Sequence, residues 1–243
     1  MNNNLLRFHA TPRWPRPARH AFPALPWRGI DDTSRAELTG SMAVFIVDGD
    51  EAHRASLQAL TRCERWRTEG LATVQELLGR APHCGPSCLV LDAALQNPGG
   101  LGWQRRVSAE RPEMPVILIA GNADVPMAVQ AMKAGAMDFL TRPVPAHRLL
   151  YAIEDALAHS RAALERSASL RAIRARHASL SRREQEVMSL VVTGLLNKQV
   201  GAELGISEIT VKAHRGSAMR KMGARSLPDL VNMANRLQGA VAG

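Results

Sequence analysis

Three short runs of apolar residues, with helix-like segments between them, most constrain how this chain can fold. The runs lie at 42–47, 88–91 and 116–120, and a weaker fourth lies at 137–140. Continuous apolar runs of this length are typical of strands buried on both faces. In the intervening segments, apolar residues recur at spacings of three and four, as in amphipathic helices at 51–62, 73–80 and 125–134. With a further strand expected within 65–71, the alternation predicts an α/β domain with a doubly wound, parallel, five-stranded sheet.

The end of the chain has a different pattern, with start and stop signals for four helices. Ser181 and Glu184 form a Ser-x-x-Glu capping box before the first helix, and Gly194 follows it. The next two helices are expected at 197–204 and, after a Ser207 cap, up to about 222, and a fourth at 227–237. Short helices joined by a glycine-containing turn predict an all-α helix-turn-helix domain, a unit that binds double-stranded DNA.

The net charge of +9 lies toward the two ends of the chain. Residues 42–150 are neutral, whereas 1–41 carry +3, 151–177 carry +2 and 178–243 carry +4. A basic C-terminal domain suits a polyanion such as DNA, although charge alone fits an acidic membrane surface equally well. We expect no membrane protein, because no run approaches the roughly 18 to 20 apolar residues that span a bilayer and there is no secretory signal.

Residues 1–41 contain five prolines and six arginines. Proline at this density removes backbone donors, so we expect a disordered, basic, Pro-rich extension. Two interpretations stay open: an arm that contacts DNA or a partner, and an inert segment that precedes a translation start at Met42.

The three cysteines form no Cys-x-x-Cys pair and have no histidine at metal-ligand spacing. We therefore expect reduced thiols in a cytoplasmic protein, without a structural zinc site. These residues are Cys63, Cys84 and Cys88.

Charged residues gather at the carboxyl ends of the predicted strands, where ligands bind in parallel sheets. They are Asp48, Asp50, Asp92 and Arg142. Their arrangement resembles the flavodoxin-like receiver domain of NarL/FixJ-type two-component response regulators. The resemblance covers about 42–158 and is closest over 124–129, 131–136 and 138–139. It implies that Asp92 is the possible phosphoacceptor and that a sensor kinase is a possible partner.

The metal-binding positions of this family are only partly matched. Receivers hold Mg²⁺ with two adjacent acids; Asp48 matches the first, but Gly49 replaces the second. Asp50 lies one residue further on and faces another way, which makes it a poor substitute. We therefore expect no cofactor, with weak Mg²⁺ binding as the remaining possibility.

The groups that act on the phosphoryl group are also replaced. Ala120 stands in place of a hydroxyl residue and cannot donate a hydrogen bond, and Arg142 stands in place of a lysine. The Arg142 guanidinium could pair permanently with Asp92 or Asp48. We therefore expect a degenerate receiver that works independently of phosphate. Slow phosphorylation of Asp92, or carboxylates that are merely solvated and held by Arg142, are the alternatives.

The helical segment at 180–237 resembles the LuxR-type DNA-binding domain of the same regulators. The matching motifs, in order, are Leu180-Ser181-x-Arg183-Glu184, Asn197-Lys198, Leu204-Gly205-Ile206-Ser207, Thr210-Val211-Lys212-x-His214 and Lys221-Met222-Gly223. The resemblance implies that the third helix enters the major groove. Lys212 then reads guanine, Ala213 meets a thymine methyl group, and Arg215 reads a base or a phosphate. Phosphate contacts are expected for Lys198, Ser207, Thr210, His214 and Arg220.

A helix from 144 to about 176 is expected to join the two domains. Its part at 159–177 is predicted to be a helical linker, either a plain exposed connector or a dimerising one. Receivers of this family commonly pair through the segments that match 124–133 and 137–151, which implies a homodimer.

Together these features predict an extension at 1–41, a receiver-like domain at 42–158, a linker at 159–177 and a helix-turn-helix domain at 178–243. We expect a sequence-specific transcriptional regulator and not an enzyme. Two alternatives stay open: a regulator switched by phosphorylation of Asp92, and an interaction protein that titrates a kinase or another regulator.

Overall fold

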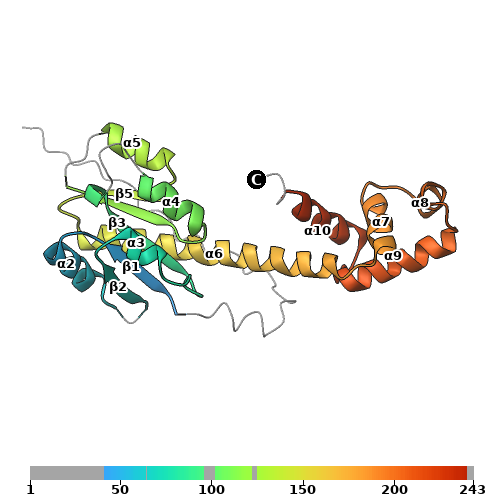
Figure 1. Ribbon diagram of the computed structural model, residues 1–243, viewed down its shortest axis with the longest axis horizontal. Helices are drawn as coiled ribbons and strands as arrows, with labels where there is room; N and C mark the ends of the chain where they lie inside the picture. The colour runs from blue at the N-terminus through green and yellow to red at the C-terminus, as the bar shows by residue number, and fades with distance from the viewer. Residues whose placement is uncertain (1–40, 64, 96–101, 122–124, 240–243) are drawn as a thin grey trace, which may run out of the picture.

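The computed structural model describes residues 41–63, 65–95, 102–121 and 125–239 (Figure 1). Residues 1–40 of the predicted extension, and Asp124 at the start of a segment that resembles receivers, lie outside the described residues.

A five-stranded parallel sheet forms the first domain, in the order β2-β1-β3-β4-β5. The strands are β1 (Ala43–Val47), β2 (Arg67–Leu71), β3 (Ser87–Asp92), β4 (Val116–Ala120) and β5 (Asp138–Thr141). Every predicted strand is present, so the predicted doubly wound sheet is confirmed. The three central strands are almost fully buried, as their unbroken apolar runs indicated.

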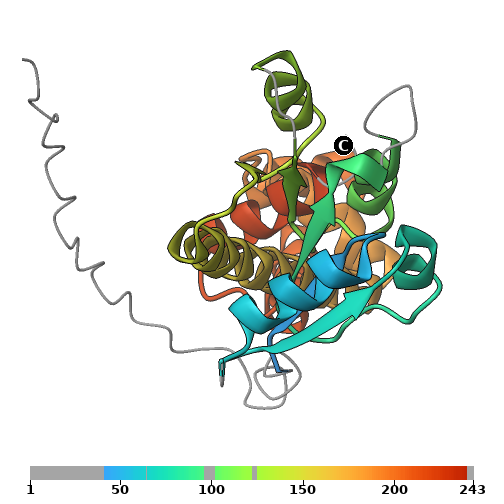
Figure 2. The ribbon, with the colours of Figure 1, turned by 90° about the vertical axis from the view of Figure 1, so that its left-hand side faces the viewer.

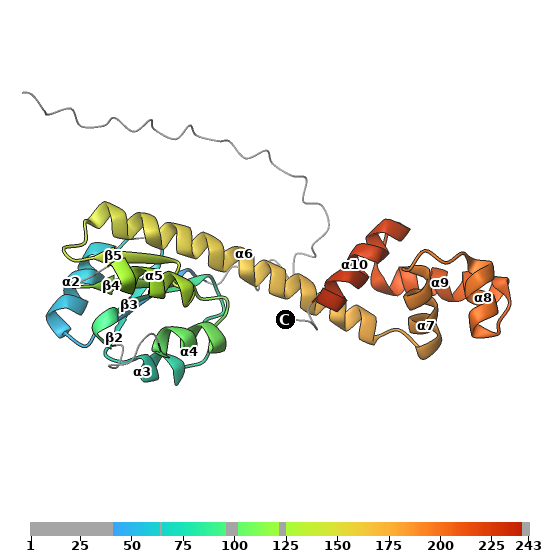
Figure 3. The ribbon, with the colours of Figure 1, turned by 90° about the horizontal axis from the view of Figure 1, so that it is seen from above.

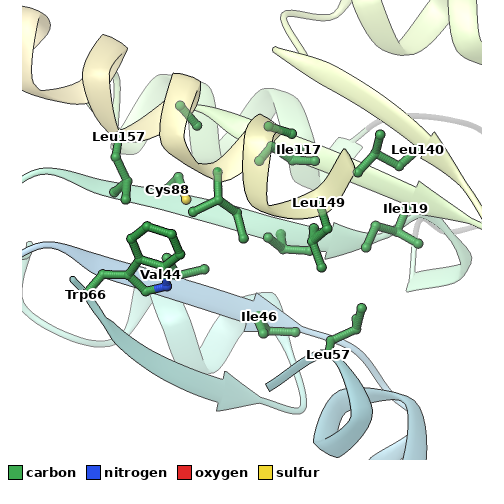
Figure 4. Close-up of a cluster of buried hydrophobic side chains, with 14 residues drawn as sticks. Val44, Ile46, Leu57, Trp66, Cys88, Ile117, Ile119, Leu140, Leu149 and Leu157 are labelled. Atoms are coloured by element: carbon green, nitrogen blue, oxygen red, sulfur yellow. The ribbon is translucent and has the colours of Figure 1, made fainter. Parts of the chain in front are cut away.

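Helices cover both faces of this sheet (Figure 2). They are α2 (Glu51–Thr61), α3 (Val74–Leu78), α4 (Gly102–Glu110), α5 (Val125–Lys133) and α6 (Ala146–Ala178), with a short 3₁₀ turn at Ala93–Leu95. One apolar core lies between the sheet and helices α2 and α6, where Trp66, Leu57 and Leu149 pack around Val44 and Ile46 (Figure 4). A second core lies on the opposite face, under α3 and α4.

The second domain contains α7 (Arg182–Val191), α8 (Asn197–Leu204), α9 (Glu208–Met222) and α10 (Leu227–Gly239). The predicted capping box is present, because Ser181 Oγ accepts from the Glu184 amide while the Glu184 carboxylate accepts from the Ser181 amide. Gly205 ends α8 in the left-handed region, with φ +66°. Because that conformation is strained for other residues, glycine here sets the tight turn between α8 and α9.

The long helix α6 runs from the sheet to the helical domain without a break over 33 residues (Figure 3). On the receiver side, Ser160 Oγ donates to the Glu113 carbonyl at 2.6 Å, and Ser167 Oγ donates to the Glu113 carboxylate at 3.0 Å. Only two residues later, Ser169 Oγ accepts from Arg236 of α10 at 3.0 Å.

The end of α6 belongs to the core of the helical domain. Ile173 is buried there with Leu180, Met188 and Met222, and Arg176 donates to the Met222 carbonyl at 3.3 Å. The segment at 159–177 is helical as expected, but it contacts both domains. Because Ile173 is buried, this segment is not a plain exposed connector over its whole length.

Candidate functional site

The carboxyl ends of β1, β3 and β5 bring together Asp48, Asp92 and Arg142. Asp48 follows β1 directly, Asp92 ends β3, and Arg142 follows β5. Arg142 Nη2 lies 2.8 Å from Asp48 Oδ2 and 3.6 Å from Asp92 Oδ2. The exposed side-chain fractions are 0% for Asp48, 8% for Asp92 and 24% for Arg142. One guanidinium group therefore faces two buried carboxylates, and removing it would leave their charges uncompensated.

Asp50 is occupied as the cap of α2. Its carboxylate accepts from the amides of Ala52 at 2.8 Å and His53 at 3.0 Å. The hydrogen bond from the His53 amide is the main cause that holds the pKa of Asp50 below its usual value. Its own amide donates to Asp48 Oδ1 at 2.8 Å. The Asp50 carboxylate thus serves to start a helix.

Gly49 and Ala120 bring no polar side chain to this edge of the sheet. The side chain of Leu95 partly fills the space beside Gly49. A β-carbon at Gly49 would lie 3.1 Å from Leu95 Cδ2. A longer side chain there would therefore require Leu95 to move. Ala120 is buried at the end of β4 and offers a methyl group in place of the hydroxyl that would contact a phosphoryl group in a receiver.

The helical domain presents α9 on its surface, next to α8. Lys212 and Ala213 are exposed on it, and Lys212 Nζ lies 3.3 Å from Glu208 Oε1. Arg215 is half-buried, and its Nη1 donates to Asn197 Oδ1 of α8 at 3.1 Å. The three predicted base readers thus lie on one helix, but Arg215 is additionally held by its neighbour.

The predicted phosphate anchors surround the start and the exposed side of α9. Ser207 Oγ caps the helix through the Thr210 amide at 3.1 Å and lies 2.8 Å from Thr210 Oγ1. Lys198 on α8 and Arg220 near the end of α9 are exposed, whereas His214 is half-buried. Basic and hydroxyl side chains of this kind contact phosphates in protein–DNA complexes.

Glu184 is a site residue whose second role sequence reasoning did not predict. Besides capping α7, this buried carboxylate accepts from Lys221 Nζ at 2.7 Å and Ser217 Oγ at 2.5 Å, both on α9. The hydrogen bond from Lys221 is the largest cause that lowers the pKa of Glu184 to about 2. The pair thus fixes α9 against α7. The capping box was the only sign in the sequence that Glu184 has a structural role. Its pairing with Lys221 gave no local signal, because the two residues are 37 positions apart.

Comparison with known proteins identifies both domains. Residues 44–154 match the response regulator receiver domain family, and residues 178–234 match the luxR family of bacterial regulatory proteins. Nodulation protein W of Bradyrhizobium diazoefficiens is 41% identical over 211 residues, which cover 87% of this chain and 92% of that protein. This chain is a NarL/FixJ-type response regulator.

Two further relatives of this response regulator match it over nearly their whole length. The transcriptional regulatory protein FixJ of Rhizobium meliloti is 40% identical, over 79% of this chain and 94% of that protein. The solved structure of the response regulator StyR is 35% identical and covers 81% of this chain and 99% of that one, with a TM-score of 0.69. The regulator is thus a transcription factor with a receiver and a LuxR-type helix-turn-helix domain, and the latter indicates DNA binding.

The receiver fold implies a Mg²⁺ ion beside Asp92, but the residues of this response regulator do not fit one. The second carboxylate is missing at Gly49, the Asp50 carboxylate caps a helix, and Arg142 already supplies positive charge to Asp48 and Asp92. Among the described residues, no group of three or more His, Cys, Asp or Glu side chains is arranged to hold a metal. In the same part of the chain, no helix has the length and apolar character needed to cross a bilayer.

Proposed function

We propose that this regulator controls transcription from specific DNA sites without phosphorylation of Asp92. The observation that carries the proposal is the contact of Arg142 with both Asp48 and Asp92. A guanidinium in this place supplies permanent positive charge to the two carboxylates, a task that a metal ion and a lysine share in a phosphorylated receiver.

The replaced groups support the same proposal. Phosphoryl transfer needs positive charge that can follow the moving group, and a metal ion held by two acids supplies it. Here Arg142 is anchored to Asp48 at 2.8 Å, and Ala120 has no hydroxyl to draw toward a phosphoryl group. Even a phosphorylated Asp92 would lack the contact by which receivers of this fold change state.

Treatment of the full chain with acetyl phosphate and Mg²⁺ tests this proposal, with intact-mass measurement of phosphate incorporation. We expect no stable labelling and the same DNA affinity before and after treatment. The matched variant combines Gly49→Asp, Ala120→Thr and Arg142→Lys, and we expect it to gain labelling. Stable labelling of the natural sequence that is lost in Asp92→Asn would instead support the phosphorylation-switched regulator.

For the DNA-binding face, we assign base contacts to Lys212 and Ala213, both exposed on α9. Arg215 donates to Asn197 at the start of α8, and this bond favours a phosphate contact over a base contact for its guanidinium. Lys198, Ser207, Thr210, His214 and Arg220 are assigned to phosphates. Selection of bound DNA by the full chain, followed by footprinting, tests the assignment. Protection of a defined inverted site supports regulation, whereas salt-sensitive binding to any sequence supports a protein that titrates a kinase or another regulator.

We also propose that the regulator is a homodimer that pairs through α5, β5 and the start of α6. Val125 and Tyr151 on this face are 78% and 65% exposed, and Val129 and Met132 are exposed beside Val125 on α5. Apolar side chains gathered on one surface favour a protein interface. Sedimentation of the full chain at increasing concentration should show a dimer, and Val125→Asp should weaken it. A monomer at all concentrations would contradict this proposal.

A further inference from the structure

The outward face of α9 is apolar at its centre. Val211, Ala218 and Met222 are buried on the inner face of this helix. Ile209, Ala213, Gly216 and Arg220 follow one another at spacings of four, three and four residues, and they therefore share the opposite face.

Ile209 at the start of this face is 80% exposed, more than any other large apolar side chain among the described residues. It is the second residue of α9, one turn before Lys212 and Ala213. An isoleucine in this position adds nothing to the core of the domain. Its branched side chain instead extends the DNA-facing surface toward the N-terminus of the recognition helix, the end that contacts base edges in helix-turn-helix complexes.

The surroundings of Ile209 favour the DNA major groove over an apolar protein partner. Lys212, which pairs with Glu208, lies along one side of the apolar stripe and Arg220 ends it, so a partner that combines negative charge with an apolar group fits it best. Arg220 Nη1 lies 3.7 Å from the place of a β-carbon at Gly216, so the Arg220 side chain folds back along the helix and places its positive charge over Gly216.

We infer that Ile209 determines specificity by contacting the C5-methyl group of a thymine. This methyl group is the apolar feature that a base pair presents in the major groove. Ala213 has a single methyl group and is already assigned to such a contact, so Ile209 would read a second thymine one helical turn away. The inference rests on the proposed DNA binding and names the chemistry that α9 recognises.

Substitution of single thymines by deoxyuridine in the selected site tests this inference, because the change removes only the C5-methyl group. Affinities of the full chain are measured at one fixed salt concentration. For two thymines in each half-site, one contacted by Ala213 and one by Ile209, we expect a loss of about fourfold at each, the effect of one buried methyl group. At one of these two positions, Ile209→Ala should bind the thymine and deoxyuridine sites equally. Ile209→Val, which keeps two methyl groups, should retain part of the difference.

Leu196→Ala is the matched control, since Leu196 is a second highly exposed aliphatic residue of this domain and lies before α8. It should keep the fourfold ratio. Alanine is a good helix former, so Ile209→Ala should fold, and circular dichroism checks this. The inference is overturned if the selected half-site contains no thymine, if no substitution affects binding, or if Ile209→Ala still distinguishes thymine from deoxyuridine at every position where the natural sequence does. Failure of the natural sequence to bind any DNA would instead contradict the proposed function.

Discussion

The Glu184 carboxylate joins two helices through the Ser181 amide, Ser217 Oγ and Lys221 Nζ. Three donors around one buried carboxylate favour its charged form, and they therefore contribute to stability only while it is ionised. Because the Glu184 carboxylate of α7 accepts hydrogen bonds from two residues of α9, its ionised form stabilises the DNA-binding domain and holds α9 in position.

We predict that Glu184→Gln lowers the melting temperature at neutral pH, and that the difference from the natural protein narrows in acid. The folded pKa of about 2 lies below the usual glutamate value of about 4.3. A depressed pKa gives stability that is fully present above the unfolded value and is lost as pH falls through the window between the two. Thermal unfolding followed by circular dichroism between neutral pH and pH of about 2.5 measures the difference in melting temperature.

The control is Glu203→Gln, a change at an exposed glutamate of α8, for which the difference in melting temperature should not narrow in acid. A constant difference at every pH would contradict the prediction.

Lys212→Ala should reduce the preference for one base pair by about 1 to 3 kcal/mol, whereas Lys198→Ala should weaken binding to all sequences similarly. The reason is that a base contact discriminates and a phosphate contact does not. Affinities for single-base variants of the selected site, measured at several salt concentrations, separate the two effects. If Lys212→Ala weakens every sequence to the same degree, Lys212 contacts only the backbone.

At the scale of residues, the strand-end cluster could be predicted because topology places strand ends together. Asp48 and Asp92 lie side by side because β1 and β3 are neighbours in the parallel sheet. Arg142 follows the edge strand β5 and reaches both carboxylates across the end of β4. The approach of Leu95 to Gly49 and the pairing of Glu184 with Lys221 could not be predicted, because tertiary packing alone brings these residues together.

At the scale of elements, strong periodic signals located their elements closely, whereas mixed ones placed β2 only within 65–71 and missed α4. The buried strands β3 and β4 have unbroken apolar runs, whereas β2 at the sheet edge is mostly half-exposed and reads Arg67-Thr68-Glu69-Gly70-Leu71. Helix α4 was not predicted, because its buried residues are only Val107 and the polar Gln104. Gln104 Nε2 donates to the Ala131 carbonyl at 2.9 Å, a partner that local periodicity cannot reveal.

The end of α6 contributes to the stability of the helical domain through Ile173. A fragment of residues 178–243 lacks this side chain and should be less stable than a fragment of residues 168–243. Ile173→Ala in the longer fragment should lower the free energy of unfolding by about 2 to 5 kcal/mol, as expected for a buried aliphatic side chain. Urea unfolding measures the difference, and Arg171→Ala, at an exposed position of the same helix, is the control. Equal stability of the Ile173→Ala and Arg171→Ala fragments would show that Ile173 contributes little.

At the scale of the whole molecule, α6 passes from receiver contacts at Ser167 to contacts of the helical domain at Ser169. The two domains therefore share a rigid helix and have almost no free connecting segment. A change in the position of α6 against the sheet would move the recognition helix with it.

Ala168→Pro should break this connection, because proline removes a helical hydrogen bond and costs about 3 kcal/mol inside a helix. We expect trypsin to cut the natural chain slowly at Arg166 and Arg171, and to cut the Ala168→Pro variant quickly into two domain-sized fragments. Mass spectrometry of timed digests identifies the cleavage points, and Ala168→Ser is the control. Equally rapid cleavage of the natural protein would mean that α6 opens between the domains in solution.

The guanidinium that closes the acidic edge of the sheet also bears on how a cell could use this protein. In the phosphate-independent mechanism proposed above, a kinase does not change the state of the receiver, because no phosphoryl group is added to Asp92. Promoter occupancy then follows the number of copies of the protein relative to its dissociation constant. Such a response is graded, and its speed is that of synthesis and degradation of the protein.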